Sequence, residues 1–403
     1  MIYLDYQATT PLAPEAAAAM RPWLDAGFAN PHSSHRLGRE AAATVELARE
    51  RVLEALQAPL PAREGPGVGG SMTAGASTDA NPPLTPPLQG GGSLFFTSGA
   101  TEAANWALKG AAARLPQSRR RIVTLATEHA AVLDTLDYLA GWGFDVDVLP
   151  VQADGLVDIA LAAERIGSGT GLVAAMLVNN EVGVIQPLEA IAALARAAGA
   201  LFFCDAAQGF GRVPIPLAGC DMVAVSAHKV HGPKGIGALW VREGVELDPL
   251  LHGGGQEGGL RSGTLSPALC AGFGAAARLL VERAADDQAH VERLWSLARE
   301  AMPLWTLNGA SGERYHGNLN LRREGVDSAG LISEVREVAF SAGSACASGS
   351  GRPSHVLAAL GLPEREARSS IRLGFGRYTA EEELLEALAL IDLAADRQLS
   401  FAA

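Results

Sequence analysis

A lysine stands at the mouth of a glycine-rich turn in Ser226-Ala227-His228-Lys229-Val230-His231-Gly232-Pro233-Lys234-Gly235, directly after the apolar run of residues 222–225. We interpret the apolar run as a buried strand, so that the amine of Lys229 lies at the strand's carboxyl end. A lysine there can form a Schiff base with a carbonyl cofactor such as pyridoxal 5'-phosphate, while Ser226 and His228 hold the cofactor's phosphate. The alternative is a solvated lysine at a strand end. Three other stretches favour the cofactor.

The first of these stretches reads Leu94-Phe95-Phe96-Thr97-Ser98-Gly99-Ala100-Thr101-Glu102 and predicts a short strand, a glycine turn and the start of a helix. The free N–H groups of a helix N-terminus, beginning at Ala100 and joined by the hydroxyl of Thr101, form a site for a phosphate monoester. A capped helix without a ligand is the alternative.

The second stretch is Leu201-Phe202-Phe203-Cys204-Asp205-Ala206-Ala207-Gln208, an apolar strand that ends in an aspartate. A buried carboxylate is costly unless it is paired, and the protonated pyridine nitrogen of pyridoxal phosphate is such a partner for Asp205. Gln208 could then reach the phenolic oxygen of the ring. Asp205 could instead cap the next helix.

The third stretch, Thr127-Glu128-His129-Ala130-Ala131, follows the strand predicted over residues 122–125 and opens a helix. The imidazole of His129 could stack on a flat ring and shuttle protons near neutral pH, or it could be structural. The four stretches together supply a phosphate cup, a ring stack, a pyridinium partner and an imine lysine. They therefore predict a pyridoxal phosphate site.

On these residues the chain resembles the cysteine desulfurases, pyridoxal phosphate enzymes of the class V aminotransferase group on fold type I. The resemblance covers nearly the whole chain and also includes Tyr3-Leu4-Asp5-Tyr6-Gln7-Ala8-Thr9-Thr10-Pro11, Asn30-Pro31-His32-Ser33-Ser34-His35, Val178-Asn179-Asn180-Glu181-Val182-Gly183, His252-Gly253-Gly254-Gly255-Gln256-Glu257, Arg261-Ser262-Gly263-Thr264-Leu265 and Ser369-Ser370-Ile371-Arg372.

The resemblance implies a role for each candidate residue. The cofactor site comprises Lys229 as the imine lysine, His129 as the stacking residue, Asp205 and Gln208 at the ring, Ala100, Thr101, Ser226 and His228 at the phosphate, and Thr264 contributed by the partner subunit of a homodimer. Asn180, which also borders the cofactor, and Arg372 grip the substrate carboxylate.

Cys346 is the expected nucleophile, in Ser341-Ala342-Gly343-Ser344-Ala345-Cys346-Ala347-Ser348-Gly349-Ser350-Gly351. Small residues on both sides predict an accessible loop, which a thiolate needs in order to attack a substrate sulfur and present it elsewhere. A buried free cysteine is the alternative. The loop resembles the longer version of the NifS and IscS branch rather than the shorter SufS version. The other three cysteines lack ligand spacing, so we expect no metal in the cofactor site.

The implied reaction converts L-cysteine to L-alanine and leaves a persulfide on Cys346, which passes its sulfur to acceptor proteins such as an iron–sulfur scaffold. One alternative is a selenocysteine lyase or another class V aminotransferase-type enzyme. A second is a non-catalytic scaffold that only binds acceptors. Such a scaffold would be expected to have lost Lys229, Asp205 or Cys346, and all three are present.

Composition favours an intracellular enzyme. The chain has 403 residues, 48% of them hydrophobic, which is enough for a large domain and a smaller one. A net charge of -12 gives no reason to expect nucleic acid or a membrane surface as a partner. We find neither a signal peptide nor a spanning stretch, and four cysteines without a framework spacing suit a reducing compartment, for which the cytoplasm is the simplest location.

Apolar runs alternate with helical stretches such as residues 188–198, and they cover residues 94–97, 122–125, 146–151, 172–178, 201–204, 222–225 and 237–241. This alternation predicts an α/β fold with a mostly parallel sheet flanked by helices and ligands at the strand ends, plus a smaller α+β domain. We assign residues 12–259 to the large cofactor-binding domain. Residues 1–11 and 260–403, including a long helix over 267–283, form the small domain that carries Cys346 and Arg372.

One stretch departs from the family. Residues 61–93 contain 14 glycines or prolines, and relatives cross this region in far fewer residues. Such a composition cannot bury enough apolar surface to become ordered. We therefore expect a disordered insertion that carries no chemistry.

Overall fold

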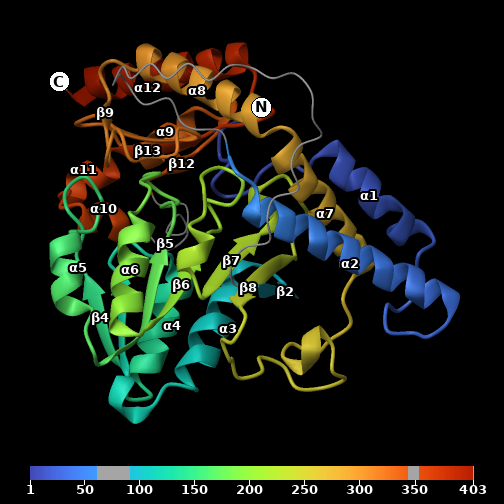
Figure 1. Ribbon diagram of the computed structural model, residues 1–403. Helices are drawn as coiled ribbons and strands as arrows, with labels where there is room; N and C mark the ends of the chain where they lie inside the picture. Colours follow the sequence, from blue (N-terminus) through green and yellow to red (C-terminus); the bar gives the residue numbers. More distant parts are fainter. Residues whose placement is uncertain (61–90, 344–353, 403) are drawn as a thin grey trace, which may run out of the picture.

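The computed structural model describes residues 1–60, 91–343 and 354–402. Its chain forms two lobes, one around a seven-stranded sheet and one around a four-stranded sheet (Figure 1). Most of the predicted insertion, and residues 344–353 around Cys346, lie outside the described residues. The insertion was placed two residues too far along the chain, because Gly92 and Ser93 belong to a strand and pair with Arg242 and Val241.

The large sheet has its strands in the order β2-β8-β7-β6-β5-β3-β4. They are β2 (Gly92–Thr97), β3 (Arg121–Leu125), β4 (Asp145–Leu149), β5 (Thr170–Met176), β6 (Leu201–Asp205), β7 (Met222–Ser226) and β8 (Gly237–Arg242). Strand β8 runs antiparallel to both of its neighbours and the other pairings are parallel. The mostly parallel sheet is confirmed, and each predicted apolar run overlaps one of these strands. The carboxyl ends of the six parallel strands therefore lie at one edge.

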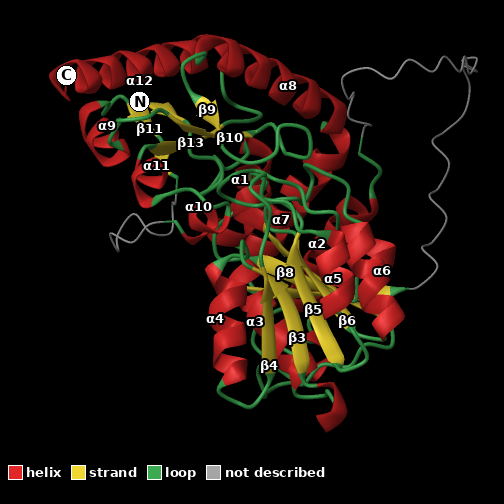
Figure 2. Ribbon diagram, turned by 90° about the vertical axis from the view of Figure 1, so that its left-hand side faces the viewer, coloured by secondary structure: helices red, strands yellow, loops and turns green. Residues whose placement is uncertain are grey.

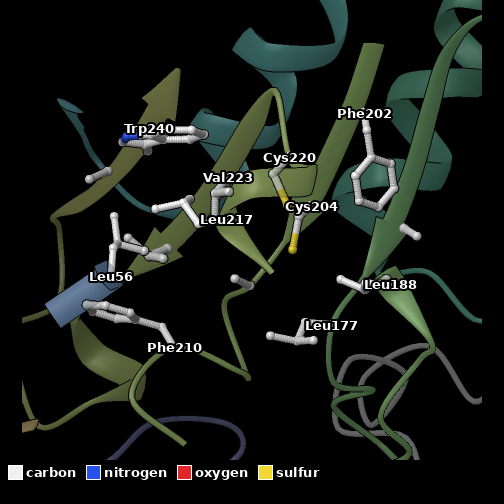
Figure 3. Close-up of a cluster of buried hydrophobic side chains, with 14 of the residues drawn as sticks. Leu56, Leu177, Leu188, Phe202, Cys204, Phe210, Leu217, Cys220, Val223 and Trp240 are labelled. Carbon is white, nitrogen blue, oxygen red and sulfur yellow. The ribbon is translucent and has the colours of Figure 1, made fainter. Parts of the chain in front are cut away.

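Both faces of this sheet are buried, which explains the continuous apolar runs. Phe203 packs on one face, whereas its neighbours Phe202 and Cys204 pack on the other. Burial of a large apolar side chain such as Phe202 contributes on the order of 2 kcal/mol. Figure 3 shows part of the core on the face that holds Phe202. Leu188, Cys204 and Cys220 belong to the same cluster of buried side chains.

Helices cover the two faces of the sheet. Helices α3 (Ala100–Ala112) and α4 (Ala130–Ala140) lie on one side, and α5 (Ile159–Arg165) and α6 (Leu188–Ala198) lie on the other (Figure 2). Helix α6 matches its predicted bounds and ends where Gly199 adopts a left-handed conformation with φ 67°. The second face also contacts α2 (Arg36–Gln57) and α7 (Pro267–Glu282), and α1 (Pro14–Asp25) packs on α7.

The smaller lobe contains the sheet β12-β13-β10-β9 and a parallel pair formed by β1 and β11. Its strands are β1 (Ile2–Tyr3), β9 (Thr306–Leu307), β10 (Asn318–Arg322), β11 (Val338–Ala339), β12 (Ser341–Ala342) and β13 (Ser370–Gly374). Its helices are α8 (Ala284–Ala301), α9 (Ser328–Glu334), α10 (His355–Ala359), α11 (Glu364–Arg368) and α12 (Glu381–Ala402). Helices α8 and α12 lie side by side across the top of the lobe in Figure 2.

The chain's first residues join this smaller lobe through β1, as the domain assignment expects. Helix α7, in contrast, contributes Phe273 and Leu280 to the core beneath the large sheet although it follows residue 260. The domain boundary at residues 259–260 stays a prediction. Within the described ranges, no helix has the length and apolarity to cross a bilayer.

Candidate active site

A cavity of about 620 Å³ lies at the carboxyl edge of the large sheet. The predicted site residues that line it are Ala100, Thr101, His129, Asn180, Asp205, Gln208, Ser226, His228, Lys229 and Arg372. Thr264 does not line this cavity and its side chain is exposed. Cys346 lies outside the described residues.

Lys229 ends the short 3-10 helix η3 (Ala227–Lys229), which directly follows β7. Its Nζ donates hydrogen bonds to the backbone oxygens of Gln7, at 2.5 Å, and Ala8, at 3.0 Å. The lysine is thus held in the wall of the cavity and is not a freely solvated side chain. Gln7 and Ala8 stand in a quoted motif but had no predicted role, because they act through backbone carbonyls that are more than 200 residues away from Lys229 in the chain.

Asp205 ends β6 and is 7% exposed. Its Oδ1 accepts a hydrogen bond from the backbone N–H of Ala207 at 2.9 Å, and turns follow instead of an α-helix, so the helix-cap alternative does not apply. Burial raises the pKa of the Asp205 carboxyl, although the nearby His129 and Lys229 oppose this. A cation bound in the cavity would favour the ionised carboxylate.

Gln208 and the half-buried Arg212 are hydrogen-bonded to each other beside Lys229. Gln208 Nε2 donates to the backbone oxygen of Gln7 at 2.9 Å, and Gln208 Oε1 accepts from Arg212 at 2.6 Å. Arg212 also donates to the backbone oxygen of Lys229 at 2.5 Å. Burial lowers the pKa of the Arg212 guanidinium. The sequence analysis missed Arg212, whose only signal is a basic residue four positions after Gln208.

The residues of the predicted phosphate cup lie at the start of α3, beside the end of β7. Helix α3 begins at Ala100, and its first backbone N–H groups have no acceptor within the helix. The Ser226 hydroxyl is buried in the cavity wall and has no hydrogen-bond partner among the described residues. A Cβ at Gly237 would lie 2.7 Å from the Cα of Gly99, so only glycine allows this approach of β8 to the cup.

Two histidines, His228 and His129, border the cavity. Burial, with the positive charges of Lys229 and Lys234, lowers the pKa of His228 to about 4, so its ring is neutral at pH 7. His129 caps α4, and its Nδ1 accepts the backbone N–H of Ala131 at 3.0 Å. A proton on Nδ1 would remove this hydrogen bond, so proton transfer by His129 would have to use Nε2.

Arg372 reaches this cavity from β13 of the smaller lobe and is 1% exposed. Its Nη1 donates to the backbone oxygen of Asn180 at 3.0 Å, and its Nη2 donates to Asp5 Oδ1 at 2.7 Å. The two predicted carboxylate-binding residues therefore lie together. The sequence analysis quoted Asp5 within a motif but gave it no role.

A second buried acid lies near Asp205. Glu128 Oε1 accepts the backbone N–H of Met176 at 2.7 Å. Burial, and to a lesser degree the neighbouring Asp205, raises the pKa of the Glu128 carboxyl well above its usual range. The shift favours the neutral form of Glu128 beside Asp205.

Comparisons with known proteins agree with this geometry. The family described as Aminotransferase class-V matches residues 2–62 and 92–387, on either side of the Gly/Pro-rich stretch. Cysteine desulfurase IscS of Rickettsia bellii is 41% identical over 399 residues, which cover 97% of this chain and 90% of that protein. A solved NifS-like protein has a TM-score of 0.84 and 32% identity and covers 99% of both chains. The structure of SspA in complex with cysteine has a TM-score of 0.76 and 34% identity, covering 94% of this chain and 100% of that one.

Proposed function

The chain belongs to the class V aminotransferase family and is a cysteine desulfurase, and we propose that it uses pyridoxal 5'-phosphate to take sulfur from L-cysteine, leaving L-alanine. The observation that supports this most directly is the meeting of Lys229, Asp205, Ser226 and Arg372 in one cavity. An amine, a buried carboxyl, an unpaired hydroxyl and a guanidinium are the groups that the cofactor and an amino acid require.

The residues present fit this cofactor. The unpaired Ser226 hydroxyl and the N-terminus of α3 would hold its phosphate together with Thr101, and the neutral His228 ring would contribute a hydrogen bond. Asp205 would face the ring nitrogen, Gln208 the phenolic oxygen and His129 the flat side of the ring. Lys229 would hold the cofactor covalently. When bound, pyridoxal phosphate supplies an electron sink for the carbanion that forms at the substrate's Cα.

The chain's own groups would then bind and deprotonate L-cysteine. Arg372 and Asn180 hold the carboxylate and so orient the substrate. The Nζ of Lys229 removes the Cα proton, and the backbone oxygens of Gln7 and Ala8 fix where that nitrogen lies. Asp205 would be held ionised by a protonated ring nitrogen bound beside it.

Sulfur transfer would belong to Cys346. Its thiolate attacks the substrate sulfur, an S–S bond forms, and the C–S bond breaks with its electron pair left on the substrate's Cβ. Protonation of that carbon, and return from Lys229 of the proton taken from Cα, give L-alanine, and the enzyme keeps a persulfide. We propose that acceptor proteins, such as an iron–sulfur scaffold, receive this sulfur in the cytoplasm.

The decisive experiment incubates the holoenzyme with L-cysteine and measures L-alanine and enzyme-bound sulfur together. We expect one bound sulfur per alanine in the first turnover, located on Cys346 by mass spectrometry. Cys346→Ser should still bind the cofactor and L-cysteine but release no alanine, because a serine hydroxyl is a poor nucleophile toward sulfur.

Other outcomes would assign another function. Alanine release at the wild-type rate by Cys346→Ser would indicate a lyase or aminotransferase, and L-selenocysteine as substrate would then identify a selenocysteine lyase. Neither alanine nor bound sulfur from a fully loaded wild-type enzyme would indicate the scaffold.

A further inference from the structure

The guanidinium that we assign to the substrate carboxylate already has a carboxylate partner within the chain. Arg372 Nη2 lies 2.7 Å from Asp5 Oδ1, and the exposed fractions of the two side chains are 1% and 20%. Arg372 Nε is buried and has no hydrogen-bond partner among the residues described. Arg372 therefore has one charged partner in place and at least one donor left for another.

Asp5 lies where three strands of the smaller lobe meet. It bridges in parallel to Gly374 at the end of β13, and Ser341 of β12 stands opposite Arg372 in the antiparallel register. The Ser341 hydroxyl donates to Asp5 Oδ1 at 2.9 Å. The same carboxylate oxygen thus accepts from both Ser341 and Arg372.

Only one of these two charged residues faces the cavity. Arg372 lines it, whereas Asp5 does not. An incoming carboxylate can therefore reach the guanidinium in the cavity while Asp5 keeps its own contact. The two carboxylates would share one buried positive charge.

We propose that Asp5 is a positioning residue that limits how tightly Arg372 holds the carboxylates of substrate and product. This inference rests on the proposed role of Arg372. A buried guanidinium without a counter-ion would gain its whole charge compensation from the ligand, whereas Asp5 supplies part of it in advance. Asp5 thereby weakens ground-state binding of L-cysteine and speeds release of L-alanine.

The test measures ligand affinity in the holoenzyme by calorimetry, using L-alanine and L-alaninamide, which lacks the carboxylate. Asp5→Asn keeps the size of the side chain and an oxygen for Ser341 but removes the charge. We expect it to bind L-alanine on the order of tenfold more tightly, while its affinity for L-alaninamide stays unchanged. Both KM for L-cysteine and kcat should fall, because release of L-alanine becomes slower.

Ser341→Ala is the matched control, since it removes a hydrogen bond to Asp5 but keeps the charge pair. It should bind L-alanine within about twofold of wild type, as expected for loss of one partly exposed hydrogen bond. Should Asp5→Asn fail to fold, Asp5→Ser carries the same expectation.

Two outcomes separate this inference from the proposed function. If Arg372→Met keeps wild-type affinity for L-alanine, the assignment of Arg372 fails and the inference fails with it. If Arg372→Met loses L-alanine but Asp5→Asn binds it no more tightly than wild type, only the inference is overturned. An equal change for L-alanine and L-alaninamide in Asp5→Asn would also overturn it, because the effect would not involve the carboxylate.

Discussion

Lys229 is anchored at both its amine and its backbone. Its amine donates to two backbone carbonyls of the N-terminal segment, and its own carbonyl accepts from the half-buried Arg212. In the proposed reaction, holding the nitrogen in place would reduce the entropy cost of each proton transfer.

Lys229→Ala should abolish the visible absorbance of the purified enzyme, which we expect to be yellow. The variant removes the only amine that we assign to covalent attachment of the cofactor. An absorption spectrum after addition of pyridoxal phosphate and gel filtration measures this. Lys234→Ala, which alters another lysine of the same cavity, should stay coloured. A colourless wild type that remains colourless after the cofactor is added would refute the cofactor assignment.

His231 makes stability depend on pH. Burial, followed by the charge of Arg377, lowers its pKa from 6.5 to about 3. Between these values the unfolded chain binds a proton that the folded chain does not. The free energy of unfolding therefore falls as the pH drops below 6.5, by roughly 1.4 kcal/mol per pH unit once the unfolded ring is charged.

His231→Asn should weaken this pH dependence. Asparagine tolerates the left-handed φ of 66° at this position and can replace the hydrogen bond to the Pro11 oxygen, but it does not titrate. Urea unfolding of the cofactor-free variant near pH 7.5 and 5.5 should show a smaller loss of stability than in wild type, by on the order of 1 kcal/mol. His228, with a pKa of about 4, should keep part of the effect. Identical pH dependence in both proteins would contradict this account.

Strand β8 packs closely against the loop before α3, and we expect the site to depend on this contact. The loop can approach β8 because residue 237 has no side chain, and the Ser226 hydroxyl lies at the adjacent strand end. The geometry of the phosphate cup is therefore built into backbone contacts.

Gly237→Ala should weaken cofactor binding at least about tenfold, because its Cβ would displace Gly99 and the amides that follow it. Fluorescence titration with pyridoxal phosphate measures the effect. Gly167→Ala is the control, since a Cβ there meets nothing within 4 Å. Equal affinity of the Gly237→Ala variant and wild type would show that the cup does not depend on this contact.

The strands could be predicted from the sequence because burial on both faces gives continuous apolar runs. Their ends were less well predicted: β5 is Thr170–Met176, whereas the apolar run continued to residue 178. Val178 follows the strand but is still buried in the core, and it also lines the cavity. Similarly, Gly92 and Ser93 join β2 through backbone pairing alone.

The site residues could be predicted where a chemically distinctive side chain follows a strand, as with Asp205, His129 and Lys229. Asp5 and Arg212 gave no such signal. Asp5 acquires its importance from contact with Arg372, which is 367 residues away in the chain, and only the packed structure brings them together. The cap formed by His129 likewise depends on a hydrogen bond that sequence does not reveal.

At the scale of the whole molecule, the N-terminal segment joins the two lobes at the cavity. The Gln7 side chain donates to Gly317 in the smaller lobe at 2.7 Å, while its backbone oxygen accepts from Lys229 and Gln208. Thr10 also donates to the His228 backbone. The guanidinium of Arg372 and the amine of Lys229 are thus held beside the same cavity although they come from different lobes.

The position of Thr264 bears on how two copies of the chain assemble. It is exposed and does not line its own chain's cavity. Three residues earlier, Arg261 pairs with Glu102 in the first turn of α3 at 2.7 Å, so the loop is anchored beside the cup. We expect a homodimer in which Thr264 completes the phosphate site of the partner subunit.

Complementation tests this arrangement. Lys229→Ala and Thr264→Ala should each be defective at limiting cofactor, the second because a hydrogen bond to a charged phosphate is lost. In a mixed dimer, the subunit that keeps Lys229 receives an intact Thr264 from its partner. Random exchange of equal amounts should therefore restore about a quarter of the wild-type sites, whereas a threonine acting within its own chain would restore none. If sedimentation shows a monomer and that monomer still binds cofactor at full occupancy, the prediction is also contradicted.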